Sequence, residues 1–167
     1  MTQFELLTPR EMAEADRLAI AGGIGEFELM QNAGVAVADA ARDMTEEAEI
    51  LVLAGPGNNG GDGFVAATEL RRAGRAVRVA LLGDRGALTG SAALAARAYE
   101  GPLEPLTRDT DLFADLVVDA LFGAGLSRDL DDEVPVRPAD FSLIDGPRPP
   151  RGCPRTLPDV IARSEPG

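Results

Sequence analysis

Two short apolar runs, each ending abruptly in a glycine-rich loop, constrain the fold of this chain more than any other feature. Residues 50–54 (ILVLA) precede the loop 55–63 (GPGNNGGDG), and residues 116–122 (LVVDALF) precede the loop 123–128 (GAGLSR). A continuous apolar run of this length is typical of a strand buried on both faces of a parallel sheet. Parallel strands end at a common edge, so both loops are expected at the same edge, where α/β proteins bind ligands.

Helical patterns surround these runs. Residues 8–11 (TPRE) have the form of a capping box with proline at the first helical position, which predicts a helix over about 9–21. The remaining predicted elements are helices over about 26–44, 61–73 and 91–99 and a strand over 77–82. Gly34 lies in the second helix, where it would let a neighbouring backbone approach closely. Strands alternating with helices predict an α/β fold with a mostly parallel sheet, preceded by a helical N-terminal lead-in.

The length of 167 residues predicts one folding unit, which we place at residues 1–130. Of the 12 prolines, 8 fall in residues 131–167, and the helix and strand patterns stop there. We therefore expect residues 131–167 to form an irregular, proline-rich tail with little order.

The overall charge and the residue types that are scarce exclude several classes of function. The formal net charge of −12 opposes binding to nucleic acid or to an anionic membrane surface. No apolar run approaches the roughly 20 residues that a membrane-spanning helix needs. A single cysteine and the lack of a signal segment predict a cytoplasmic protein. The chain has no histidine, so carboxylates would carry acid and base chemistry.

The first loop contains the candidate ligand-binding residues. Gly55, Gly57 and Gly60 satisfy the G-x-G-x-x-G pattern, and Asp84 follows the next predicted strand, as in NAD-dependent oxidoreductases. Tight packing between a strand and a helix would produce the same glycines. The amides of residues 58 and 59 can grip phosphate or ribose, whereas Asp62 is either an N-cap or an acceptor for ligand hydroxyls.

Asp119 interrupts the apolar run at 116–122. A buried, unpaired carboxylate costs several kcal/mol, so Asp119 would require a cation or a set of donors, which backbone amides can supply. If Asp119 converges with the side-chain oxygen of Asn58 or Asn59, the two side chains offer an all-oxygen site suited to a hard cation such as potassium. Arg128 would either neutralise a phosphate or remain a surface arginine near other acids.

Three segments together resemble a known family. They are residues 29–34 (LMQNAG), residues 54–63 (AGPGNNGGDG) and residues 118–128 (VDALFGAGLSR). The set resembles the YjeF N-terminal domain, the NAD(P)H-hydrate epimerase family. The resemblance implies a three-layer αβα Rossmann-like fold, usually dimeric, that interconverts the R and S forms of hydrated NADH and NADPH. An ADP- or ATP-dependent dehydratase would be the partner that completes the repair of these nucleotides.

The same resemblance implies roles for individual residues. Asn59 and Asp119 would be potassium ligands. The substrate-binding residues would be Asn58, Asn59, Gly60, Gly61, Asp62, Gly123, Ala124, Gly125, Leu126, Ser127, Arg128 and Asp129. Family members continue with a strand reading approximately VDIPSG, which residues 131–167 do not spell; truncation, a frameshift or divergence of the C-terminal part would explain this. Residues 141–146 (FSLIDG) are the nearest fragment, which makes Asp145 the candidate for the missing acid.

Two other functions remain open at this point. The first is a non-catalytic nucleotide-binding or scaffold module with the same fold. The second is an NAD-dependent oxidoreductase that uses the Gly55, Gly57 and Gly60 turn together with Asp84; this reading leaves Asn58, Asn59 and Asp119 unexplained.

Overall fold

The computed structural model describes residues 7–44 and 49–123. Its elements, in chain order, are α1 (Pro9–Ala21), α2 (Glu26–Met44), β1 (Glu49–Ala54), α3 (Asn58–Arg72), β2 (Ala76–Leu81), a 3-10 turn η1 (Arg85–Ala87), α4 (Gly90–Ala98), β3 (Leu103–Pro105) and β4 (Leu116–Ala120). None of the helices in these two ranges is both long and apolar enough to cross a membrane.

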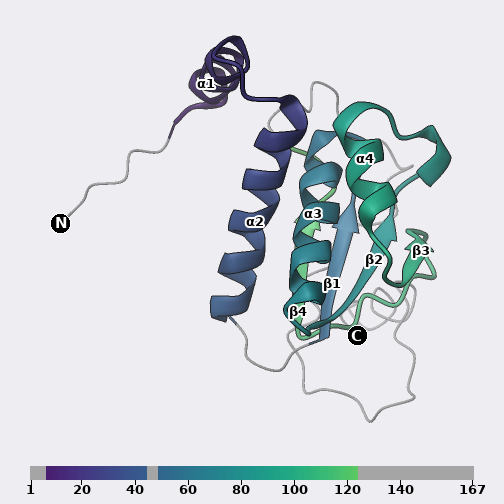
Figure 1. Ribbon diagram of the computed structural model, residues 1–167. Coiled ribbons are helices and arrows are strands. Elements are labelled where there is room, and N and C mark those ends of the chain that lie inside the picture. Colours follow the sequence, from purple (N-terminus) through teal and green to yellow (C-terminus); the bar gives the residue numbers. More distant parts are fainter. Residues whose placement is uncertain (1–6, 45–48, 124–167) are drawn as a thin grey trace, which may run out of the picture.

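The four strands form one parallel sheet in the order β3-β2-β1-β4 (Figure 1). β1 occupies an inner position, and its residues 50–54 are at most 1% exposed. Its two partners are in register with it, since Leu53 pairs with Ala80 of β2 and with Asp119 of β4. The predicted α/β fold with a parallel sheet is confirmed.

Helices α2, α3 and α4 cover one face of this sheet, with α3 in the middle (Figure 1). Phe64 and Leu70 of α3 are fully buried against Ile50 and Val52 of β1. Small residues allow the helices to approach closely. A Cβ on Gly34 of α2 would collide with the side chain of Val65, which confirms the close approach expected there.

The opposite face of the sheet is covered differently. Leu51 and Leu53 of β1 pack against an irregular segment, residues 106–114, which we call the strap. Its buried members are Leu106, Thr110, Leu112 and Ala114. Among residues 7–44 and 49–123, no helix lies on this face, so the second helical layer of the expected sandwich is not seen in the described part of the chain.

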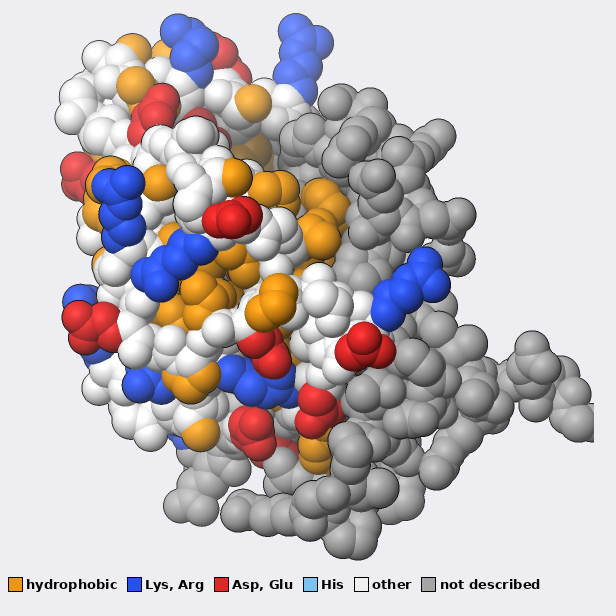
Figure 2. Space-filling model, turned by 90° about the vertical axis from the view of Figure 1, so that its right-hand side faces the viewer, with side chains coloured by type: hydrophobic (Ala, Val, Ile, Leu, Met, Phe, Trp, Pro, Cys, Tyr) orange, Lys and Arg blue, Asp and Glu red, His pale blue; other side chains and the backbone are white. Residues whose placement is uncertain are grey.

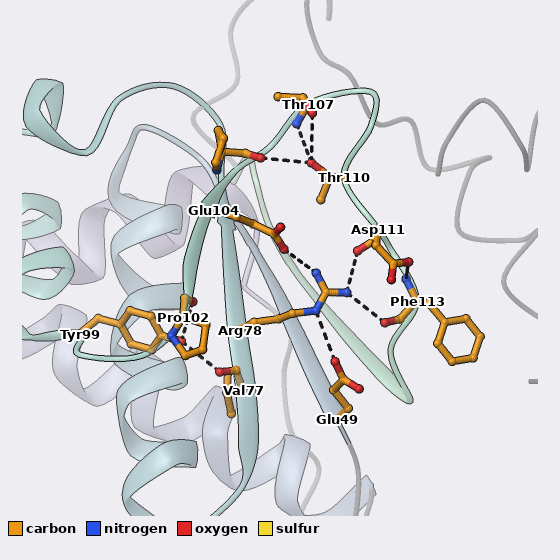
Figure 3. A network of polar contacts seen from close by, with 11 residues as sticks. Glu49, Val77, Arg78, Tyr99, Pro102, Glu104, Thr107, Thr110, Asp111 and Phe113 are labelled. Atoms are coloured by element: carbon orange, nitrogen blue, oxygen red, sulfur yellow. Dashed lines mark hydrogen bonds and ion pairs between the residues drawn. The ribbon is translucent and has the colours of Figure 1, made fainter. Parts of the chain in front are cut away.

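Arg78 of β2 fastens the strap to the sheet (Figure 3). Its guanidinium donates to the backbone carbonyls of Asp111 and Phe113, at 2.6 and 3.0 Å. It also pairs with Glu104 of β3 at 2.6 Å and with Glu49 of β1 at 3.5 Å. One side chain that is 16% exposed therefore ties two neighbouring strands and the strap together.

The side of the molecule that carries β3 exposes both apolar and charged side chains (Figure 2). Apolar side chains are exposed in the middle of this view, and acidic and basic side chains lie interspersed below them. Positive charge is therefore mixed with negative charge on the described part of this side.

Helix α1 extends from the N-terminal end of α2 (Figure 1). The capping box is present: the side chain of Thr8 accepts from the amide of Glu11, and the carboxylate of Glu11 accepts from the amide of Thr8. No residue of α1 is buried. Local capping thus defines this helix, as the sequence predicted.

Most predicted boundaries agree with the structure, with two corrections. Helix α3 begins at Asn58 and not at about residue 61, so six residues of the glycine loop, 58–63, are helical. Strand β3 was not predicted, because it is only three residues long and ends in a proline. The proposed boundary at residue 130 and the tail 131–167 lie outside the described residues.

Candidate functional site

The two glycine loops begin in contact with each other. The amide of Gly55, directly after β1, donates to the carbonyl of Ala120 at the end of β4 at 3.0 Å. A Cβ at position 55 would overlap the backbone carbonyl of Leu121, so only glycine fits between the two strand ends. The loops therefore leave the same edge of the sheet, as expected from the sequence.

The first loop turns directly into α3. Gly57 is the N-cap residue, and no side chain caps the helix. A Cβ on Gly60 would overlap the carbonyl of Gly55, so the first turn of α3 folds back over the end of β1. A helix that begins without a side-chain cap presents backbone N–H groups and the positive end of its dipole to an anion.

Asn59 joins the first loop to the second. Its Oδ1 lies 3.3 Å from the position that a Cβ on Gly123 would occupy. Asn59 is half-buried, whereas its neighbour Asn58 is exposed. The structure thus brings Asn59 and Gly123 together. The other predicted site residues of the second loop (Ala124, Gly125, Leu126, Ser127, Arg128 and Asp129) and Asp145 lie outside the described residues.

The expectation of a buried charge at Asp119 is wrong. Asp119 is exposed, and its Oδ1 accepts a hydrogen bond from the amide of Leu121 at 3.0 Å. The physical reason is its position: β4 is the outermost strand of the sheet within residues 49–123, and Asp119 is one residue from its end. Its side chain shares a face with Val117, opposite α3, because side chains alternate along a strand.

The donors at this edge fit a hard cation better than a transition metal. The carboxamide of Asn59 and the second carboxylate oxygen of Asp119 have no hydrogen-bond partner among the described residues. Hard cations prefer carboxylate, amide and backbone oxygens. Within residues 7–44 and 49–123 there is no cluster of three or more His, Cys, Asp or Glu, so a cation held by Asn59 and Asp119 would need further oxygen ligands.

Asp62 is the ionisable group of the first loop. It lies inside α3, five residues after the N-cap, so the N-cap role considered for it is wrong. It is half-buried, and this burial, together with the nearby carboxylate of Asp16 in α1, raises the pKa of Asp62 to about 6. The sequence offered no signal for this effect, because the repelling acid comes from a helix 46 residues earlier in the chain.

Asp84, the acid that an oxidoreductase would place on ribose, has a structural role here. It is the N-cap of η1, and its Oδ1 accepts from the amide of Gly86 at 2.5 Å. This local bond accounts for an acid at position 84 without any ligand.

Fold and site together define a parallel α/β domain with two glycine loops converging at the carboxyl edge of its sheet. Residues 26–137 match the family described as YjeF-related protein N-terminus, and the chain belongs to this family. The resemblance found in the sequence is confirmed.

Similar proteins carry consistent names. The chain is 44% identical over 122 residues to the bifunctional NAD(P)H-hydrate repair enzyme Nnr of Coxiella burnetii, covering 71% of this chain and 25% of that protein. It is 41% identical over 138 residues to the NAD(P)H-hydrate epimerase of Rhodobacter capsulatus, covering 75% and 65%. The chain thus spans about a quarter of the bifunctional relative and just under two thirds of the epimerase.

A solved structure supports the fold. The crystal structure of the yeast protein YNL200c superposes with a TM-score of 0.60 at 23% identity, covering 84% of this chain and 63% of that one. This likeness concerns the arrangement of helices and strands.

Proposed function

We propose that this domain is an NAD(P)H-hydrate epimerase, an isomerase that interconverts the R and S forms of hydrated NADH and NADPH. The observation that carries the proposal is the convergence of the two glycine loops, through Gly55 with Leu121 and Asn59 with Gly123. Relatives at 44% and 41% identity are named for this repair reaction.

The roles of the site residues follow from their chemistry. The first turn of α3, residues 58–61, offers amides and the helix dipole to the phosphates of the nucleotide. Asp62 would repel a phosphate and suits hydroxyl groups of the substrate instead. Gly123 begins the second wall of the site, which we extend to residues 124–129, with Asp145 as a candidate acid from the tail.

Asn59 and Asp119 are the proposed ligands of a potassium ion. Both offer oxygens at the carboxyl edge of the sheet, Asn59 beside Gly123 and Asp119 one residue before the end of β4. When bound, potassium would supply positive charge that balances the substrate's phosphates and carboxylates nearby.

Epimerisation at the hydrated ring is redox-neutral. It requires the carbon that carries the hydroxyl to lose and regain its configuration, which ring opening and reclosure accomplish with proton transfers at the hydroxyl oxygen and at the ring nitrogen. The chain has no histidine, so the transfer at the hydroxyl falls to a carboxylate of the site.

The proposal also covers a partner enzyme, the location of the protein and its oligomeric state. An ADP- or ATP-dependent dehydratase would consume one epimer, in line with relatives whose name is a bifunctional repair enzyme. We further propose that the protein acts in the cytoplasm and as a homodimer.

A coupled assay tests the function. The R form of hydrated NADH is incubated with the purified chain in potassium buffer, and an S-specific dehydratase reports each epimerised molecule as restored NADH. We expect R to be consumed faster than its spontaneous rate. Asp119→Asn should lower the rate and raise the potassium concentration needed for half-maximal activity. Asp43→Asn, an exposed change on α2, should do neither.

Folded protein that binds the hydrated nucleotide without accelerating its epimerisation would contradict the epimerase function and indicate a non-catalytic nucleotide-binding module. Reduction of NAD by an alcohol would favour the oxidoreductase instead.

A further inference from the structure

The contacts around Asp62 place its side chain on the substrate side of α3. Asn59, one turn earlier on the same side of the helix, lies against Gly123 of the second loop. Gly63 lies against Ala120 of β4, and Val65 lies against Gly34 of α2. The side chain of Asp62 therefore projects from α3 between the side of the helix that meets β4 and the side that meets α2. This is the end of the helix where the glycine loops converge.

The surroundings of Asp62 hold no compensating charge among the described residues. No hydrogen bond or ion pair joins its half-buried carboxylate to another residue of ranges 7–44 and 49–123. The residues that α2 and β4 contribute to the core beside α3 are apolar or glycine: Met30, Gly34, Ala38, Val118 and Ala120. The charged group that acts on Asp62 is Asp16 of α1, another acid.

We propose that Asp62 takes up and returns the hydroxyl proton of the carbon whose configuration is inverted. This inference rests on the proposed epimerase function.

The proposed step balances. The carboxylate of Asp62 removes the hydroxyl proton, and the carbon–oxygen single bond becomes a carbonyl. The bond from that carbon to the ring nitrogen breaks, its electron pair stays on nitrogen, and nitrogen takes a proton from water. After rotation of the open chain, nitrogen attacks the other face of the carbonyl, water recovers its proton, and Asp62 returns the first proton to oxygen. Nothing is oxidised or reduced.

The protonation behaviour of Asp62 suits this step. Burial, followed by repulsion from Asp16, raises the pKa of Asp62 to about 6. A group with a pKa near the working pH both accepts and returns a proton readily. A fully exposed carboxylate, in contrast, would be almost permanently ionised at neutral pH and would return a proton poorly.

The test compares kcat and its pH profile in four proteins. In the wild type, kcat should rise with pH through about 6, because the ionised form of Asp62 starts the step. Asp62→Asn should lower kcat about 100-fold or more with little change in KM, the usual size of a general acid–base contribution. Asp16→Asn should leave the plateau value of kcat unchanged. It should move the rise of kcat to lower pH, because the variant removes the repulsion between Asp16 and Asp62. Asp43→Asn should change neither.

The outcomes separate the two proposals. A wild-type protein without epimerase activity overturns the function and this inference together. An active wild type with an Asp62→Asn variant that retains more than half of kcat overturns the inference alone. If Asp62→Asn fails to fold, Asp16→Asn decides: an unshifted pH profile overturns the inference, and a shift to lower pH supports it.

Discussion

The two faces of the sheet are held by different physical means. On the helix-covered face, large apolar side chains such as Phe64 and Leu70 are buried, and glycines let α2 and β4 approach α3. On the other face, the irregular strap packs a smaller apolar cluster around Leu51 and Leu53 and is fixed by the guanidinium of Arg78. The helical face should therefore be sensitive to side-chain volume, and the strap face to the loss of one cation.

The largest expected effect is the loss of volume on the helical face. Phe64 is 0% exposed and meets the ring of Tyr99 at a centroid distance of 5.9 Å. Phe64→Ala should destabilise the domain by about 3–5 kcal/mol, because it leaves a cavity beneath α3. Urea unfolding measures the change. Leu94→Ala, at a side chain in α4 that is 48% exposed, is the control and should cost about 0.5 kcal/mol or less.

Added volume should also be costly where the loops meet. Gly55→Ala forces a Cβ into the carbonyl of Leu121 and should cost about 1–3 kcal/mol, the usual penalty of overpacking. Gly57→Ala is the matched control, since nothing lies within 4 Å of a Cβ there. Equal unfolding free energies for the two variants would show that the loops are not in close contact.

The strap face is tested by a variant that removes the charge of Arg78 and keeps a long side chain. Arg78→Met leaves the carbonyls of Asp111 and Phe113 without their donor and should cost about 1–3 kcal/mol. Amide hydrogen exchange should become faster in residues 106–114 and stay unchanged in α3. Arg97→Met in α4 is the control. Uniformly faster exchange in α3 and the strap would contradict the separation of the two faces.

The smallest expected effect concerns pH, and it comes from Asp62, a half-buried carboxylate of α3. The pKa of Asp62 is raised to about 6 in the folded state, so the folded protein keeps the carboxyl proton up to a higher pH than the unfolded chain does. Stability should therefore fall as pH rises from about 3.8 to about 6 and then level off. Comparing the unfolding midpoints of the wild type and Asp62→Asn at pH 4 and pH 7 isolates this contribution. A wild-type midpoint that rises relative to the variant over this range would contradict the direction.

The sequence predicted the elements that are encoded locally. The capping box at Thr8 defines the start of α1, and the limits of α2 agree with its predicted range. The start of α3 was placed too late, because Gly57 caps the helix without a side-chain bond and glycines give no helical pattern. Three residues of β3 are too few to show an alternating pattern.

Long-range contacts explain what the sequence did not predict. Arg78 stands in an apolar strand, and its partners at 104, 111 and 113 are 26 to 35 residues away in the chain. The surroundings of Asp62 depend on α1 in the same way. For Asp119, apolar neighbours suggested burial, but it is exposed, near the end of the outermost strand among the described residues. The glycine loops were placed correctly because strand ends in a parallel sheet share one edge.

The central claim is that the two glycine loops form one site for a hydrated nicotinamide nucleotide. Amide chemical shifts, followed during titration of the labelled protein with hydrated NADPH, test it most directly. We expect the amides of residues 57–61 and of Gly123 to shift together and to fit a single Kd, while those of the strap stay unchanged. Shifts confined to one loop, or centred on residues 106–114, would contradict the claim.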